Sequence, residues 1–170
     1  MTHPLHRELG KKAINEFGSN VLLDPACGKG HNLPLFSSEE KLRETEFCDV
    51  DMLVLKGGEV KVIFEIEESN IKPTQICGKM LTAALSKYYI YKDKKYPLSS
   101  SIIFIQVVDT SKLKNESKKI PQFENLGKAI QEDIRFKNDR IISYKLYLVK
   151  GEHDKEQIDN IFADAHDFLK

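Results

Sequence analysis

The chain has 170 residues, of which 41% are hydrophobic and 31% charged, as is usual for a soluble globular domain with one core. Its 26 basic and 26 acidic residues cancel, so no global field attracts nucleic acid or an anionic membrane, although a local basic face can coexist with an acidic site. No apolar run approaches the ~20 residues needed to span a bilayer, and the first residues lack the layout of a signal peptide. We therefore predict a cytoplasmic protein without a membrane partner.

The first part of the chain predicts a helix, a short strand and a long loop. Apolar residues at helical spacing indicate a helix from Leu5 to Phe17. Val21 to Leu23 is typical of a short strand. The stretch from Pro25 to Glu46 is rich in glycine, proline, serine and charged residues, which predicts mostly loop.

The second part begins with an apolar hairpin, FCDVDMLVLKGGEVKVIFEIEE (Phe47 to Glu68), that turns at a Gly-Gly pair. Periodicity then predicts a helix, a strand, a helix, a strand and a helix, over residues 74–91, 99–108, 121–136, 140–149 and 154–169. No linker divides residues 1–170. The predicted fold is therefore a single α/β domain in which a mixed β-sheet is flanked by helices.

Acidic residues in this hairpin recur at intervals of two: Asp49 and Asp51 in the first arm, Glu65 and Glu67 in the second. Alternate residues of a strand share a face, so each pair puts two carboxylates on one side of its strand. Acidic side chains are poor strand formers, and they repel one another across a ladder. Their accumulation favours a site for a hard divalent cation such as Mg²⁺ or Mn²⁺.

Whether the two acidic pairs meet depends on the register of the hairpin. With a strict two-residue turn Asp51 would lie opposite Phe64, so Asp51 and Glu65 would point to opposite sides of the sheet. A three-residue connection or a β-bulge changes the parity, and then either Asp51 or Asp49 lies opposite Glu65. The metal interpretation therefore requires an odd-length turn or a bulge.

These motifs resemble those of the PD-(D/E)xK nuclease superfamily, which includes restriction endonucleases, Holliday-junction resolvases and RecB-like nucleases. Asp51 precedes an aliphatic strand, and the next strand ends in FEIEE, with Glu65 in the acidic position. Glu67 stands where a lysine is usual, and a few restriction endonucleases are similar in carrying Glu-x-Glu. The resemblance extends from Leu5 to Val108.

The resemblance implies a restriction-endonuclease-like fold and a Mg²⁺-dependent endonuclease (or one that uses Mn²⁺) that hydrolyses phosphodiester bonds of DNA. The enzyme would be of the restriction or the repair and resolvase type, and a homodimer would allow it to cut both strands. Asp51 and Glu65 would bind the metal, and Glu67 would be a ligand or base at the lysine position. Glu8, in the first helix, would be an auxiliary acid.

The helix after the hairpin offers replacements for the missing lysine. Lys72 or Lys79 would supply the displaced cation, and an early glutamine is similar to that of some superfamily branches. The candidate nucleic-acid contacts are Lys72, Gln75, Lys79 and Lys29.

Three alternatives remain open. The missing lysine and the neutral net charge fit a catalytically inactive nuclease-like module that binds DNA or another partner. A second alternative is that Glu65, Glu67 and Glu68 line an exposed strand end, where surface acids contribute little energy. The loop DPACGKG (Asp24 to Gly30) resembles the cofactor loop of S-adenosylmethionine-dependent DNA amino-methyltransferases, although no helix is predicted directly after it. Its glycines and Lys29 would otherwise suit contact with a phosphate backbone.

Overall fold

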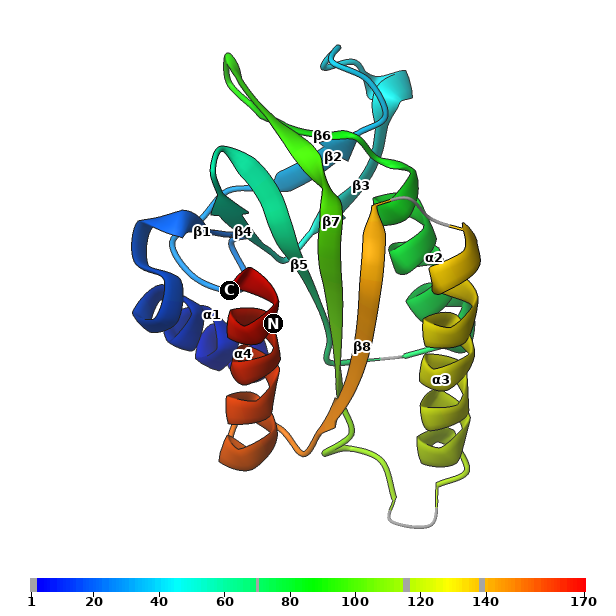
Figure 1. Ribbon diagram of the computed structural model, residues 1–170. Helices are drawn as coiled ribbons and strands as arrows, with labels where there is room; N and C mark the ends of the chain where they lie inside the picture. The colour runs from blue at the N-terminus through cyan, green and yellow to red at the C-terminus, as the bar shows by residue number, and fades with distance from the viewer. Residues whose placement is uncertain (1–2, 70, 115–116, 138–139) are drawn as a thin grey trace.

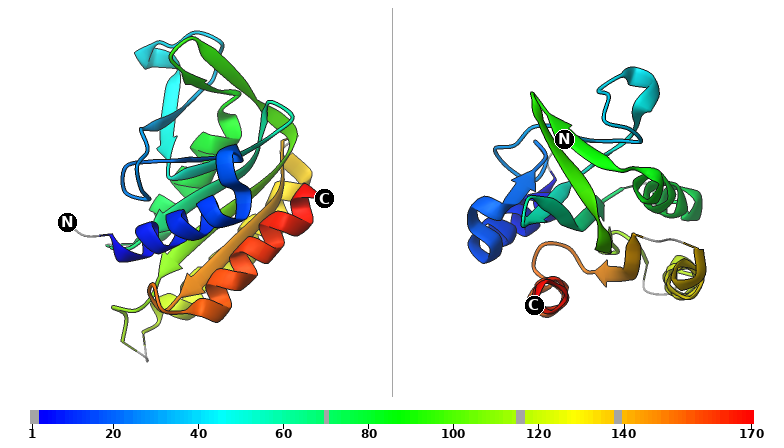
Figure 2. Two further views of the ribbon diagram at one scale, coloured as in Figure 1. Left: turned by 90° about the vertical axis from the view of Figure 1, so that its left-hand side faces the viewer. Right: turned by 45° about the horizontal axis from the view of Figure 1, so that its top comes forward.

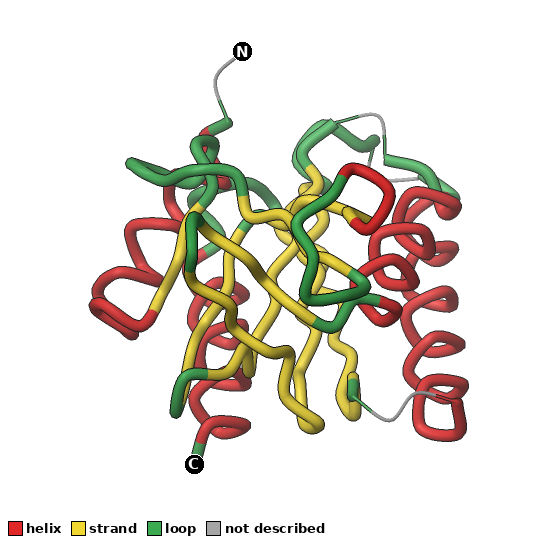
Figure 3. The backbone as a smooth tube through the Cα atoms, turned by 90° about the horizontal axis from the view of Figure 1, so that it is seen from above, coloured by secondary structure: helices red, strands yellow, loops and turns green. Residues whose placement is uncertain are grey.

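The chain folds into three layers, with one mixed β-sheet between two pairs of α-helices (Figures 1 and 3). The computed structural model describes residues 3–69, 71–114, 117–137 and 140–170. The predicted α/β fold, a mixed sheet flanked by helices, is confirmed. None of the helices in the described ranges combines the length and the apolar character needed to cross a membrane.

The described elements follow one another along the chain as α1 (Pro4–Phe17), β1 (Val21–Leu23), β2 (Leu33–Phe36), β3 (Glu46–Val50), β4 (Met52–Lys56), β5 (Glu59–Glu67), α2 (Pro73–Leu85), β6 (Tyr88–Tyr91), β7 (Lys94–Asp109), α3 (Lys119–Lys137), β8 (Ile141–Val149) and α4 (Lys155–Leu169). Two predictions were wrong in detail. The helix expected to continue through residue 91 ends at Leu85, and the aromatic residues that follow form β6. The predicted loop over residues 25–46 contains strand β2.

The strands are ordered β1-β4-β5-β7-β6-β2-β3, and β8 also pairs with β7. The central strands β5, β7 and β8 run parallel, whereas the other pairs are antiparallel. Strand β7 is long enough to serve both parts of the sheet. Its first residues pair with β6, and its second half, Ile102–Asp109, pairs with β8 and also lies against β5.

Each face of the sheet has its own apolar core. Helices α2 and α3 cover one face, and α1 and α4 lie side by side on the other (Figures 1 and 2). A 2.7 Å ion pair between Lys12 and Asp159 also links α1 to α4. Because both faces are covered where β5 and β7 pair, residues 62–66 of β5 and 102–108 of β7 form nearly continuous apolar runs, and Glu65 and Glu67 of β5 lie inside the protein.

Candidate functional site

A β-bulge at Lys61 determines which acids of the hairpin meet. The turn itself has two residues, because Lys56 pairs with Glu59, and both turn glycines have positive φ angles of 63° and 79°. One extra residue in β5 then shifts the register, so that Met52 pairs with Phe64. Of the open alternatives, the structure thus shows a bulge rather than a longer turn.

The chain bends at Asp51, between β3 and β4, and this separates the two aspartates. Strand β3 pairs with β2, so Asp49 is exposed opposite Pro34 rather than facing β5. The single unbroken hairpin expected from the sequence was therefore wrong. Asp51, next to the shifted register, falls opposite Glu65, and its Oδ2 accepts a 2.6 Å hydrogen bond from the Ile66 amide.

Asp51 and Glu65 form a buried carboxyl pair that Lys79 of α2 partly neutralises. Glu65 has no exposed surface, and both its carboxylate oxygens accept hydrogen bonds from Lys79 Nζ, at 3.1 and 3.3 Å. Burial and the charge of Asp51 raise the pKa of Glu65 well above its ordinary value. Burial alone would raise the pKa of Asp51 too, but hydrogen bonds from His6, Glu65 and the Ile66 amide lower it. Of the two carboxyl groups, Glu65 is therefore the one that binds a proton more readily, as expected of two close carboxyl groups.

The ammonium group of Lys79 stays charged in this setting. Burial alone would lower the pKa of Lys79, but the negative charges of Glu65 and Asp51 outweigh it and raise the pKa. Of the two lysines considered as the displaced cation, Lys79 is thus the one beside the acidic pair, whereas Lys72 is exposed just before α2.

Glu67 lies on the same face of β5 as Glu65 and keeps an unused acceptor atom. Its Oε2 accepts a 2.8 Å hydrogen bond from Gln75 Nε2, in the first turn of α2. Its Oε1 is buried and has no hydrogen-bond partner among the described residues. Burial raises the pKa of Glu67. A buried carboxylate oxygen without a partner is unfavourable unless something else binds it.

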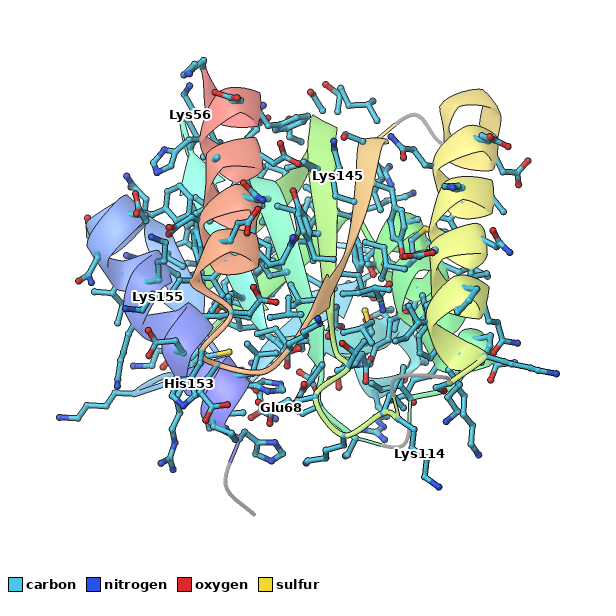
Figure 4. The ribbon with its side chains drawn as sticks, turned by 90° about the horizontal axis from the view of Figure 1, so that it is seen from below. Lys56, Glu68, Lys114, Lys145, His153 and Lys155 are labelled. Carbon is cyan, nitrogen blue, oxygen red and sulfur yellow. The ribbon has the colours of Figure 1, made fainter. Side chains whose placement is uncertain are left out.

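The next acid, Glu68, holds the start of α1 against the end of β5 (Figure 4). Its Oε1 accepts hydrogen bonds from the backbone amides of Leu5 at 2.5 Å and His6 at 3.1 Å, so it caps a helix that lacks a side-chain cap of its own. The ring of His6 then lies with Nε2 3.7 Å from Asp51 Oδ1. Sequence reasoning missed His6 and Glu68, because Glu68 contacts residues more than 60 positions away and His6 contacts Asp51 across 45 positions.

The remaining predicted residues lie apart from this cluster. Glu8 is half-buried on α1, and in the described part of the chain it is His6, not Glu8, that contacts Asp51. Lys29 is exposed in the loop after β1. All three glutamates at the end of β5 are buried, so the interpretation of Glu65 and its neighbours as an exposed strand end was wrong.

The loop from Asp24 to Gly30 is a tight turn that leads into strand β2. Asp24 Oδ1 accepts a 2.9 Å hydrogen bond from the Cys27 amide. A Cβ on Gly30 would lie 1.7 Å from the Leu23 carbonyl oxygen, so close packing accounts for this glycine. A dinucleotide-type cofactor loop runs from a parallel strand into a helix, whereas β1 is antiparallel to β4 and the loop precedes a strand.

The candidate site thus gathers three carboxyl groups, one ammonium group and one imidazole, from Asp51, Glu65, Glu67, Lys79 and His6. Carboxylate oxygens are the ligands that hard divalent cations prefer. The first turns of α1 and α2 add the partial positive charge of their N-termini, which stabilises ionised carboxylates and opposes a further cation. No family model, curated protein or solved structure matches this chain.

Proposed function

We propose that this protein is a metal-dependent endonuclease that hydrolyses phosphodiester bonds of DNA, with Asp51 and Glu65 as ligands of Mg²⁺ or Mn²⁺. The observation that carries the proposal is the bulge at Lys61, which places Asp51 opposite Glu65 inside the protein. Two close buried carboxyl groups destabilise a fold unless a proton or a cation is shared between them. A bound cation would offset the repulsion between the two carboxylates.

The donor set supports a hard cation. Asp51, Glu65 and Glu67 offer only carboxylate oxygens, and Glu67 Oε1 is without a hydrogen-bond partner among the described residues. Mg²⁺ binds through one or two carboxylates and keeps several waters. It would compete with protons and with Lys79 for the oxygens of Glu65.

The chain's own residues have separate roles in the proposed reaction. A bound Mg²⁺ would offset charge on the phosphodiester and lower the pKa of a water. Lys79 would place a second positive charge beside the reacting phosphate. Glu67, whose burial raises its pKa, would accept the proton of the attacking water, and Gln75 fixes its orientation. His6 positions Asp51 from the other side.

The order of elements adds support from the fold. The resemblance implies a core of helix, three-stranded meander, helix and strand. Helix α1, the antiparallel strands β1, β4 and β5, helix α2 and strand β7 occur in that order along the chain, with β2 and β3 inserted before β4 and β6 before β7. Lys72 and Lys29 are exposed and available for phosphates. A homodimer would bring two such sites to the two DNA strands.

Cleavage of supercoiled plasmid in Mg²⁺ or Mn²⁺ tests this function. We expect Asp51→Asn, Glu65→Gln and Lys79→Met each to lower the cleavage rate by about 10²-fold or more, as is typical for loss of a general acid–base or charge-stabilising group. The matched control is Asp49→Asn, which removes an exposed acid two residues from Asp51 and should cleave like the wild type.

Failure of the pure wild type to cut duplex, branched or single-stranded DNA with either metal would overturn the enzymatic proposal. Binding of the same DNA in a mobility-shift assay would then favour the catalytically inactive nuclease-like module. Equal loss of activity in Asp49→Asn and Asp51→Asn would also contradict the proposal, because it would show that cleavage depends on the number of negative charges rather than on the pair of Asp51 and Glu65.

A further inference from the structure

A second group of possible metal ligands lies beside the acidic site, at the first turn of α1. His3, His6 and Glu68 each offer one ligand atom, and these three atoms lie within 4.8 Å of one another. Glu68 Oε2 is 3.1 Å from His3 Nδ1, and Glu68 Oε1 is 3.6 Å from His6 Nδ1. The two imidazoles meet edge to face, with ring centroids 5.1 Å apart.

Capping of α1 does not by itself account for this arrangement. The cap uses only Oε1 of Glu68, and it requires no histidine. His6 is 7% exposed, and its Nδ1 is buried without a hydrogen-bond partner among the described residues. Leaving a buried ring nitrogen unpaired is unfavourable, so an unpaired nitrogen next to a carboxylate and a second imidazole indicates a missing partner.

We propose that His3, His6 and Glu68 bind a transition-metal ion, with Zn²⁺ as the best match. Two imidazole nitrogens and one carboxylate oxygen are a common zinc ligand set, and tetrahedral bonds of about 2.0–2.1 Å place ligand atoms roughly 3.3 Å apart. The separations of 3.1 Å from His3 Nδ1 to Glu68 Oε2 and 3.6 Å from His6 Nδ1 to Glu68 Oε1 are close to that value, and each imidazole faces a different oxygen of the carboxylate. His3 is partly exposed, which leaves room for water as a fourth ligand.

The ion differs in kind from the one proposed for the acidic site. Imidazole suits Zn²⁺ and other later transition metals, whereas Mg²⁺ prefers oxygen ligands alone. The N-terminus of α1 carries a partial positive charge that opposes a cation. Glu68 already neutralises that charge, and the carboxylate of Asp51, 3.7 Å from His6 Nε2, adds a second negative group.

Zn²⁺ bound to His3, His6 and Glu68 would influence the acidic site through the imidazole ring of His6. With Nδ1 of His6 coordinated, Nε2 would keep its hydrogen and direct it toward Asp51 Oδ1, 3.7 Å away. Donation from a metal-bound histidine to a carboxylate is the usual way in which the surroundings of a metal site are oriented. The transition metal would therefore fix Asp51, but its binding does not depend on the proposed nuclease activity.

Titration of the full chain with Zn²⁺, after treatment with EDTA, tests the inference by calorimetry, and absorption of the Co²⁺ form identifies the ligand type. We expect one site per chain, and affinity about 100-fold lower in His3→Ala and in Glu68→Gln, since a direct ligand should matter at least as much as the surrounding residues that change affinity 10–100-fold. Glutamine keeps an oxygen for the amides of α1, so Glu68→Gln is expected to fold. His153→Ala is the matched control, because His153 is 93% exposed in its side chain and lies next to Glu152 rather than in the cluster.

Glu65→Gln separates this site from the proposed nuclease site, since it should lose cleavage and keep Zn²⁺ binding. Three results would overturn the inference. The first is absence of Zn²⁺ binding by the wild type, and the second is undiminished binding by His3→Ala. The third is a Co²⁺ spectrum with the strong sulfur charge-transfer bands of cysteine ligation.

Discussion

Replacing Lys79 by methionine is the most direct probe of the buried charges. Methionine keeps the length and apolar stem of lysine but removes the ammonium group that donates hydrogen bonds to Glu65. The carboxyl pair of Glu65 and Asp51 then loses its cation. We expect the folded protein to be less stable at neutral pH, where the raised pKa of Lys79 keeps this residue fully charged in the wild type.

The structure sets the magnitude. Lys79 Nζ makes two hydrogen bonds, at 3.1 and 3.3 Å, to a carboxylate that has no exposed surface. Removing one partner of a fully buried ion pair costs about 3–5 kcal/mol. Lys79 itself is 35% exposed, so water screens the pair and replaces part of the interaction. We therefore expect a loss of about 1–3 kcal/mol.

A double-mutant cycle isolates the interaction. Urea unfolding in EDTA is measured for the wild type, Lys79→Met, Glu65→Gln and the double variant, with Lys128→Met of α3 as an exposed-lysine control. The coupling energy between Lys79 and Glu65 should account for most of the loss. In Mg²⁺ titrations Lys79→Met should bind about tenfold more tightly or better, since a competing positive charge a few ångströms away is gone, while cleavage is lost.

Additive effects, with a coupling energy below about 0.5 kcal/mol, would refute the reasoning, because they would show that Lys79 and Glu65 act independently. Weaker Mg²⁺ binding by Lys79→Met would also contradict it. That result would mean that Lys79 supports the metal site rather than competing with the cation.

Two further predictions concern protonation and packing. Burial, and then the charge of Asp51, raise the pKa of Glu65, so the folded protein keeps a proton that the unfolded chain releases above its ordinary pKa of 4.5. Without metal, wild-type stability should therefore fall with rising pH, and Glu65 contributes up to about 1.4 kcal/mol per pH unit to this slope. Glu65→Gln should have a shallower slope, the remainder coming from Glu67, whose pKa burial also raises; parallel profiles from about pH 5 to about pH 8 in urea unfolding would contradict this. Gly10→Ala should destabilise by roughly 1–3 kcal/mol, because its Cβ would lie 2.1 Å from the Cys27 carbonyl oxygen. Gly78→Ala, in a helix with no atom within 4 Å of the new Cβ, should stabilise by about 0.5–1 kcal/mol, and thermal melts that rank the two variants the other way would refute this packing.

Much of the fold follows from local periodicity. Apolar spacing placed α1 and α4, and the unbroken apolar run of residues 99–108 indicated the buried central strand β7. Strand β6 was missed because Tyr88 fits the helical spacing of the residues before it. The helix ends at Leu85, and the Lys87 amide instead bonds to the Phe36 carbonyl oxygen at 2.7 Å, a partner that no local pattern reveals.

The sequence by itself determined that Asp51, Glu65 and Glu67 occur at strand spacing within apolar segments, because a strand's side chains alternate whatever it pairs with. Only the tertiary structure decided that Asp51 faces Glu65. One bulged residue, Lys61, reverses the parity of an entire strand, and no periodicity encodes it. The same holds for the approach of α1 to the end of β5 and of Lys79 to Glu65. Those contacts depend on how the helices pack on the two faces of the sheet, and helix packing is decided by the whole core rather than by any one segment.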